Sequence, residues 1–305
     1  MTTTADPVTR PPASGAPNLT RSALSFRRRF TNQFSLIMIS LALVVAVIPL
    51  GLVIWSVISR GGSAISWEFL TADIPNSFRR SGGGVGPAVI GTLIITGMAA
   101  LMAIPLGVLG AIYLNEYGKQ KPLARVIRTM ANIMTGVPSI VMGLFIYSAW
   151  VLLFDARTGF AGALALACLM LPVIIRSTEE MLRLVPDELR QASLALGARK
   201  WRTTVTVVLP AAISGITSGV LLAIARAAGE TAPIVFVVGI TSAPNWNLFD
   251  GENTALPAQI FRNASQVFEP AQQRAWGSAL TLIVIVLVFT IIARIIANRF
   301  AIKER

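Results

Sequence analysis

The sequence contains no histidine and one cysteine, Cys168, which lies inside an apolar run. Without a second cysteine the chain cannot form an internal disulfide. A metal or redox centre built on Cys and His ligands is not expected either, because such sites need several of these residues at short spacing. The lack of histidine also removes the imidazole base on which many hydrolases and transferases depend. We therefore expect a non-catalytic chain without a metal site.

Charge is scarce as well, with 13% charged residues against 54% hydrophobic residues in a chain of 305. A soluble domain of this size needs far more charge on its surface, so the composition indicates a protein that crosses a membrane several times. The phosphate-loop pattern GxxxxGK[ST] is also absent. The sequence therefore predicts that this chain has no cofactor of its own and does not hydrolyse ATP.

Hydrophobic runs of about 20 residues, the length that crosses a bilayer, predict an all-α membrane protein with six transmembrane helices. The first, Phe34–Ile58, follows a polar tail at residues 1–33 that we expect to be disordered. A signal peptide is the alternative, but this run is long and begins late in the chain. The other five lie in a core at residues 87–298 and are predicted at Pro87–Leu114, Val126–Phe154, Gly159–Ile175, Ala211–Val238 and Trp276–Ala297.

Basic residues indicate how the spans are oriented. If the amino terminus is cytoplasmic, 19 Lys and Arg residues lie in cytoplasmic segments and six in external ones. This excess favours two cytoplasmic termini, the second at residues 299–305. The loops at residues 59–86 and 239–275 are then external, and the loop at 176–210 is cytoplasmic. The net charge of +12 thus lies along a membrane face, which argues against nucleic-acid binding.

The longest polar passage in the second half of the chain, Val185–Pro210, predicts a short surface helix. Pro186 can begin it, and Asp187 and Glu188 fall in the first turn, where the helix dipole favours acids. Gly197 then provides a stop, before a second helical run from Arg199 to Leu209. One helix face carries mostly small side chains: Leu189, Ala192, Ser193 and Leu196. This face favours docking in a protein groove, and resting on anionic lipid is the alternative.

Arg226 and Glu230 are charged residues within a predicted span and lie four residues apart. An arginine near a bilayer centre costs at least about 2.5–3.5 kcal/mol on insertion scales and usually faces a cavity or a partner. Gly229 and Pro233 would permit a local helix break, which membranes tolerate beside a cavity. Two interpretations remain open: the pair neutralises itself inside a bundle, or it lines the path of an anion.

The passage LRQASLALGARKWRTTVTVVLP resembles the coupling-helix (EAA) signature of ABC importer permeases. Gly197, Leu209 and Pro210 match that signature, whereas Gln191 replaces its Glu and Ser193 its second Ala. From Val85 to Phe300 the chain resembles the phosphate permeases of the PstA type more closely. The segments that carry this likeness are GPAVIGTLIIT, TGVPSIVMGLF, LAIARAAGETAPIVF, LPAQIF and AWGSAL.

The resemblance implies the fold of a type I (MetI-like) importer permease in a bacterial inner membrane. It implies a second permease of the PstC type, two ATPase copies of the PstB type that bind the ATP, and an external phosphate-binding protein of the PstS type. It places the family's membrane arginine and glutamate on Arg226 and Glu230. ATPase contacts would fall on Glu188, Leu189, Gln191, Ala192, Ser193, Leu196 and Gly197, and helix breaks or hinges on Pro210, Gly229 and Pro233.

Other functions stay open at this stage. A permease for sulfate or molybdate is the nearest alternative, because one arginine cannot distinguish tetrahedral anions by charge. A proton-coupled anion carrier would use Glu230 as a relay and would need no ATPase. A membrane scaffold or sensor would need neither Arg226 nor a pore.

Overall fold

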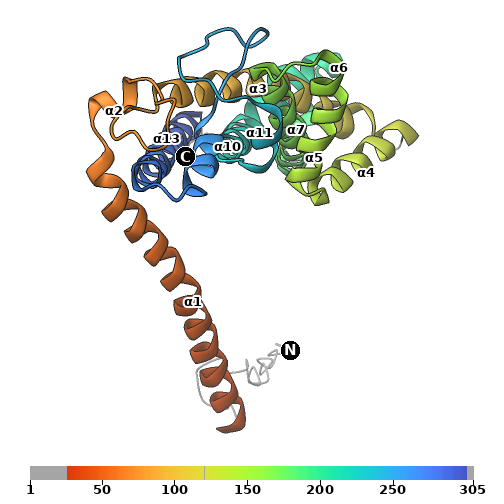
Figure 1. Cartoon of the computed structure of the whole chain (residues 1–305). Coiled ribbons are helices and arrows are strands. Elements are labelled where there is room, and N and C mark those ends of the chain that lie inside the picture. The colour runs from red at the N-terminus through yellow and green to blue at the C-terminus, as the bar shows by residue number, and fades with distance from the viewer. Residues whose placement is uncertain (1–25, 120, 301–305) are drawn as a thin grey trace, which may run out of the picture. The chain divides into compact units, whose positions relative to one another are not determined.

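The computed structural model describes residues 26–119 and 121–300, in two units that divide after Ile54. The first unit holds most of α1 (Phe26–Gly61), a helix of 36 residues that contains the predicted first span (Figure 1). The predicted disorder is wrong for residues 26–33, which belong to this helix, and the rest of the predicted tail lies outside the described residues. Apolar side chains are exposed all round this helix, with Ile39 exposed by 69% and Val45 by 60%. A helix that is apolar on every side is typical of a membrane span.

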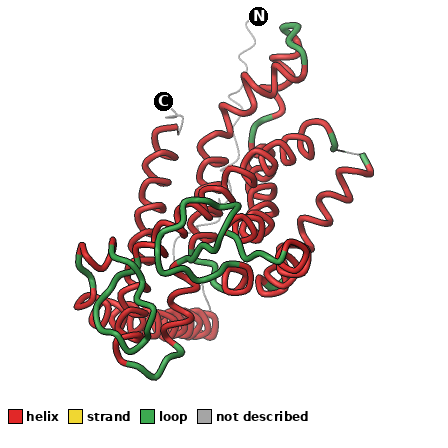
Figure 2. The backbone as a smooth tube through the Cα atoms, turned by 45° about the horizontal axis from the view of Figure 1, so that its top comes forward, coloured by secondary structure: helices red, strands yellow, loops and turns green. Residues whose placement is uncertain are grey.

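The second unit, from Trp55 onward, consists of helices and loops, and no strand occurs in the part of the chain that the structure describes (Figure 2). Two elements precede the helical core, η1 (Gly62–Ala64) and α2 (Trp67–Thr71). The core elements are α3 (Gly86–Ile112), η2 (Tyr113–Tyr117), α4 (Pro122–Gly136), α5 (Ser139–Ile146), η3 (Tyr147–Val151), α6 (Leu152–Phe154), α7 (Gly159–Leu184), α8 (Asp187–Ala195), α9 (Lys200–Thr203), η4 (Thr204–Val208), α10 (Leu209–Ala228), α11 (Ala232–Val237), α12 (Leu256–Ala264) and α13 (Glu269–Phe300).

Helices α3, α7 and α10 form the centre of this unit (Figure 1). Many side chains in this core are small and fully buried, including Ala99 and Ala103 on α3 and Ala163 on α7. Small residues let helix backbones approach closely, which favours helix association where lipid removes the hydrophobic driving force. At Gly107 of α3, an added Cβ would lie 2.6 Å from Cγ2 of Ile174 on α7. The core therefore depends on close contact between helices.

The predicted third span, Val126–Phe154, is not straight. Its residues form α4 and α5, whose axes bend by 107° at the break between them. The cause is Pro138, which lacks an N–H and forces the residue before it out of the helical conformation. Val137 is accordingly extended, with φ −71° and ψ 127°.

The predicted fourth span, Gly159–Ile175, ends too early, because α7 continues to Leu184. The added turns are polar and carry ion pairs at helical spacing, Arg176 with Glu180 and Glu179 with Arg183. Such pairs stabilise helical turns that apolar periodicity does not reveal. Within the described residues, five helices are long and apolar enough to span a membrane, or six if α4 and α5 count as one span.

At Pro210, where a helix break or hinge is predicted, the helix does not break, since one helix runs from Lys200 to Ala228. The role of Pro210 as a hinge stays a prediction. Its turn η4 is a π turn, in which the Leu209 N–H bonds to the Thr204 carbonyl five residues back. The wider turn accommodates a proline, which cannot donate to the helix ladder and collides with a carbonyl in a regular α-helix. The passage after Gly197 is therefore continuous with the following span.

The loops gather at two ends of the second unit. At one of them, which we call the loop end, the stretch before α3 meets the stretch after α11, and the Ile74 N–H donates to the Ser242 carbonyl at 2.9 Å. The start of α7 lies there too, with the Gly159 N–H bonded to Asn253 Oδ1 at 2.9 Å. At the other end, which we call the coupling end after the coupling helix predicted there, η2 meets α8 through an ion pair between Arg190 and Glu116.

Candidate functional site

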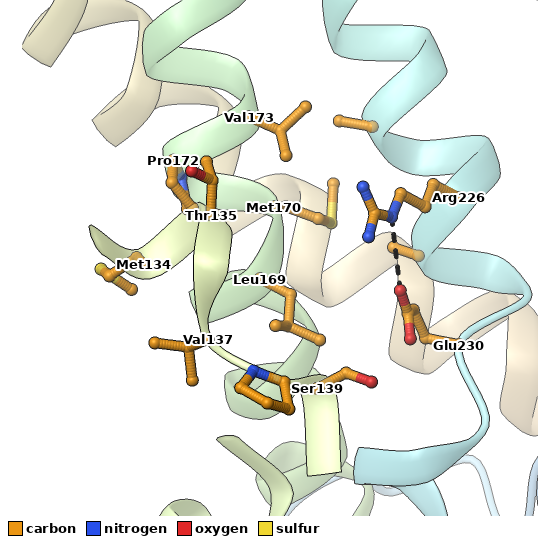
Figure 3. Close-up of a pocket in the computed structure, with 13 residues that line it drawn as sticks. Met134, Thr135, Val137, Ser139, Leu169, Met170, Pro172, Val173, Arg226 and Glu230 are labelled. Atoms are coloured by element: carbon orange, nitrogen blue, oxygen red, sulfur yellow. Dashed lines mark hydrogen bonds and ion pairs between the residues drawn. The ribbon is translucent and has the colours of Figure 1, made fainter. Parts of the chain in front are cut away.

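Arg226 lies in the last turn of α10, and Glu230 lies just beyond the end of that helix. Arg226 Nε lies 3.4 Å from Glu230 Oε1 (Figure 3). The Arg226 side chain is 70% exposed, whereas that of Glu230 is 18% exposed. The two side chains therefore form an ion pair, which leaves most of the Arg226 side chain uncovered by this chain.

The helix is interrupted between Arg226 and Glu230. Gly229 caps the carboxyl end of α10, and the Glu230 N–H bonds to the Ala227 carbonyl. Helix α11 then begins at Ala232, with Pro233 in its first turn, where a missing N–H costs nothing. Arg226 thus lies at the negative end of the α10 dipole, which favours its charge.

The pair lines a cavity of about 240 Å³ whose walls come from α4, α5, α7 and α10 (Figure 3). Its other polar side chains are Thr135 and Ser139, on either side of the bend at Pro138, and the rest of the wall is mainly apolar. Pro172 of α7 lines the same space. Bent and broken helices thus meet at one cavity, which is where a membrane protein can hold irregular backbone.

The predicted surface helix exists as α8, and it has no buried residue. Leu189 is 45% exposed and Leu196 is 90% exposed. The helix ends in a Schellman motif: the Ala198 N–H bonds to the Ser193 carbonyl, and the Gly197 N–H to that of Leu194. Gly197 has φ +82°, a conformation that glycine adopts without strain. Leu189 and Leu196 thus leave apolar surface exposed at this helix, and its docking on a partner stays a prediction.

The residues predicted on α8 do not all face the same way. Glu188, Gln191 and Ala192 are exposed. Ser193 is partly buried, and its hydroxyl lies 2.9 Å from Thr203 Oγ1 on α9. Leu194 is 47% exposed, although it was not predicted as part of the docking face. Ser193 thus joins α8 to the helix that follows it, and Leu194 joins the exposed surface.

Arg190 anchors α8 to the bundle, a role that the sequence did not reveal. Its side chain is 12% exposed, and that of its partner Glu116 is 6% exposed. Glu116 Oε1 accepts from Nη2 of Arg190 at 3.0 Å and from Nε at 3.2 Å. Arg190 also donates to the carbonyls of Leu182 at 2.8 Å and Val185 at 2.6 Å. One side chain therefore joins α8, the end of α7 and η2.

A second buried carboxylate, Glu179 of α7, binds two arginines at the same end of the unit. Its Oε1 lies 2.6 Å from Nη2 of Arg128 on α4 and 2.6 Å from Nη2 of Arg183. Glu179 is 6% exposed. Sequence spacing could have revealed the pair with Arg183, but the pair with Arg128 depends on the bundle.

Residues 103–302 match a family model described as the binding-protein-dependent transport system inner membrane component. The chain belongs to this family. Its curated relatives include the phosphate transport system permease protein PstA 1 of Mycobacterium tuberculosis (strain ATCC 25618 / H37Rv), which is 43% identical over 288 residues, or 92% of each chain. The PstA permease of Yersinia pestis is 39% identical over 272 residues, or 88% of this chain and 90% of the relative. The predicted likeness to PstA permeases is confirmed.

Two kinds of solved transporter share the fold. An inward facing structure of the MetNI methionine ABC transporter gives a TM-score of 0.57 at 19% identity, covering 72% of this chain and 95% of that chain. A bacterial alginate ABC transporter gives 0.62 at 13% identity, covering 90% and 97%. At these identities the likeness shows the fold alone, and the predicted all-α permease fold is confirmed. The permease is thus an inner-membrane transport subunit with several apolar helices.

Proposed function

We propose that this permease forms half of the pore of an ATP-driven importer for inorganic phosphate. The observation that carries the proposal is Arg226, whose side chain is 70% exposed beside a cavity. An arginine in a span needs a cavity or a partner, and this chain alone covers little of it. A homologous second permease of the PstC type, packed against α10, would enclose Arg226 in a shared pore. The curated relatives named as phosphate permeases support phosphate as the anion.

The exposed helix α8 would dock on a cytoplasmic ATPase of the PstB type, one copy for each permease. A binding protein of the PstS type would deliver phosphate at the loop end. This orientation puts both termini in the cytoplasm, and the excess of 19 basic residues over six supports it. ATP would thus be bound by a partner chain.

The continuous helix from Lys200 to Ala228 supplies a mechanical link between α8 and Arg226. Its 29 residues extend about 43 Å at 1.5 Å per residue. Ser193 fixes α8 to Thr203 at the start of this helix, and Arg226 lies in its last turn. When ATP draws the two ATPases together, α8 would move with them and tilt the helix that carries Arg226. The pore would then change from inward-open to outward-open.

Phosphate is preferred to sulfate or molybdate because of the relatives, since a single guanidinium attracts any of these anions. A proton-coupled carrier would leave the exposed face of α8 without a role. The exposed face of α8 therefore favours the ATP-driven importer.

The test is phosphate uptake by the assembled importer with Arg226→Gln, beside the charge-retaining Arg226→Lys. Loss of a charge-assisted contact of about 1.5–3 kcal/mol should lower uptake roughly 10- to 100-fold in Arg226→Gln. Insertion and assembly should be unchanged, and Arg226→Lys should keep part of the activity. Undiminished uptake in Arg226→Gln would show that Arg226 does not line the phosphate path.

A further inference from the structure

A second polar cavity, of about 140 Å³, lies at the loop end on residues that do not line the Arg226 cavity. It lies between the stretch before α3, the stretch after α11, α12 and the start of α13. A water molecule takes up about 30 Å³ in the liquid, so a small ion with some of its waters fits this space. The polar side chains that line it are Asn76, Ser242, Gln259, Arg262, Asn263 and Arg274.

Three of these side chains are almost fully buried: Gln259 is 2% exposed, Asn263 is 1% and Arg274 is 5%. Each has a buried atom with no hydrogen-bond partner among the described residues, namely Gln259 Oε1, Asn263 Nδ2 and Arg274 Nε. An unpaired buried donor is unfavourable, so a ligand that accepts from it is favoured. Two of the three atoms are N–H donors, and the Gln259 amide can turn over to present its NH₂ group. The cavity is thus suited to an acceptor.

Positive charge also concentrates here. Four of the six arginines predicted to be external lie at this cavity or in the loop beside it: Arg79, Arg80, Arg262 and Arg274. Among the described residues, none of the four has a carboxylate within 4.0 Å. The arginines at the coupling end differ, since Arg128, Arg183 and Arg190 each bind a glutamate. The charge at the loop end therefore remains available to an anion.

The cationic groups are held in place. Arg274 donates to the carbonyls of Arg80 at 2.6 Å and Phe78 at 3.3 Å, and its Nε has no partner in the part of the chain that the structure describes. The Arg262 guanidinium lies over the Phe78 ring, 4.9 Å from its centroid, and Arg262 is an exposed residue of the cavity wall. Asn76 Oδ1 accepts from the Ser242 hydroxyl, so the Asn76 NH₂ group is left to donate. Donors fixed before a ligand arrives bind it at lower entropic cost.

We propose that this cavity binds a small dissolved oxyanion of the phosphate class, as a site separate from Arg226. Two arginines and the amides of Asn76 and Asn263 would supply charge-assisted and neutral hydrogen bonds to its oxygens. The binding itself follows from the cavity alone. Its use in import, where the site would hold phosphate at the entrance before it reaches Arg226, rests on the proposed function.

A purely structural role is the competing explanation, because Arg274 holds the loop at residues 78–82 through carbonyl contacts. Arg262 separates the two roles, since its side chain is exposed and makes no hydrogen bond through its guanidinium among the described residues. Arg79→Gln is a matched control. It removes the same charge from the neighbouring loop, and Arg79 does not line the cavity.

The experiment is calorimetric titration of inorganic phosphate, and separately of sulfate, into the permease pair in lipid nanodiscs. All variants carry Arg226→Gln, so that binding in the pathway is removed. We expect one remaining phosphate site, which Arg262→Gln weakens roughly tenfold or more and Arg79→Gln leaves within about twofold. Asn263→Asp, which replaces a donor by a negative charge of the same shape, should abolish binding. Melting curves without phosphate show whether each variant is folded.

Absence of phosphate and sulfate binding in the Arg226→Gln protein would overturn the inference. Equal binding by the Arg262→Gln and Arg79→Gln variants would overturn it as well. Neither outcome concerns the proposed function, which fails if Arg226→Gln leaves uptake undiminished.

Discussion

Replacement of Glu116 by Gln tests whether the buried ion pair with Arg190 holds α8, the proposed coupling helix, against the bundle. The change keeps the shape of the side chain and removes its charge. Arg190 Nη2 and Nε lie 3.0 and 3.2 Å from Glu116 Oε1, and both side chains are nearly buried. The carbonyls of Leu182 and Val185 still accept from Arg190 in the variant. The variant therefore weakens the attachment without removing it.

The size of the effect follows from this geometry. A hydrogen bond to a charged group contributes about 1.5–3 kcal/mol and a neutral one about 0.5–1.5, so Glu116→Gln should cost about 1–2 kcal/mol. Arg190→Ala leaves a carboxylate buried without its partner, which costs about 3–5 kcal/mol. Glu180→Gln is the matched control, because its ion pair with Arg176 lies on α7 and both side chains are more than half exposed. Its loss should cost about 0.5 kcal/mol or less.

Hydrogen exchange of the α8 amides measures this attachment, because their exchange rates rise with the population in which α8 is open. We expect roughly tenfold faster exchange in Glu116→Gln and more than about 100-fold in Arg190→Ala, at 1.4 kcal/mol for each factor of ten. The amount of phosphate imported per ATP should fall in the same order. If both variants exchange at the rate of Glu180→Gln, the ion pair does not hold α8 and the reasoning fails.

Two further substitutions test the packing and the docking surface. Gly91→Ala on α3 would bring a Cβ against the Thr254 carbonyl, whereas a Cβ added at Gly97 would meet no atom of the described residues within 4 Å. We expect thermal unfolding to show about 1–3 kcal/mol of destabilisation for Gly91→Ala and none for the control Gly97→Ala, and equal melting temperatures would contradict the contact. Ala192→Glu puts a charge on the exposed face of α8 and should lower phosphate uptake per ATP roughly tenfold in the reconstituted importer. Gln191→Glu, the control with the same charge, restores the residue of the coupling signature and should keep uptake, so equal coupling in both variants would show that Ala192 does not contact the ATPase.

The spans were predictable because lipid imposes a length and an apolar composition on each helix. The 107° bend between α4 and α5 was not predicted, although Pro138 marks its place, because a proline can also be accommodated within a helix. Pro210 gives the opposite case: a π turn keeps its helix continuous. Whether a proline breaks a helix depends on whether neighbouring turns can widen, and one sequence does not show this.

At the site, Arg226 and Glu230 were found because charge in an apolar span is costly and visible in the sequence. The residues that position α8 were missed for the opposite reason. Arg190 looks like an ordinary charge on a polar helix, and its partner Glu116 lies 74 residues earlier. Only the packing of α8 beside η2 shows that this pair is buried.

The central claim is that this chain moves phosphate only as part of an ATP-driven assembly. The direct measurement is uptake of radiolabelled phosphate and sulfate by vesicles that contain this chain, its permease partner, the ATPase and the binding protein. We predict phosphate uptake that requires ATP and every partner, with sulfate excluded. Uptake by this chain alone under a proton gradient, or faster uptake of sulfate than of phosphate, would contradict it.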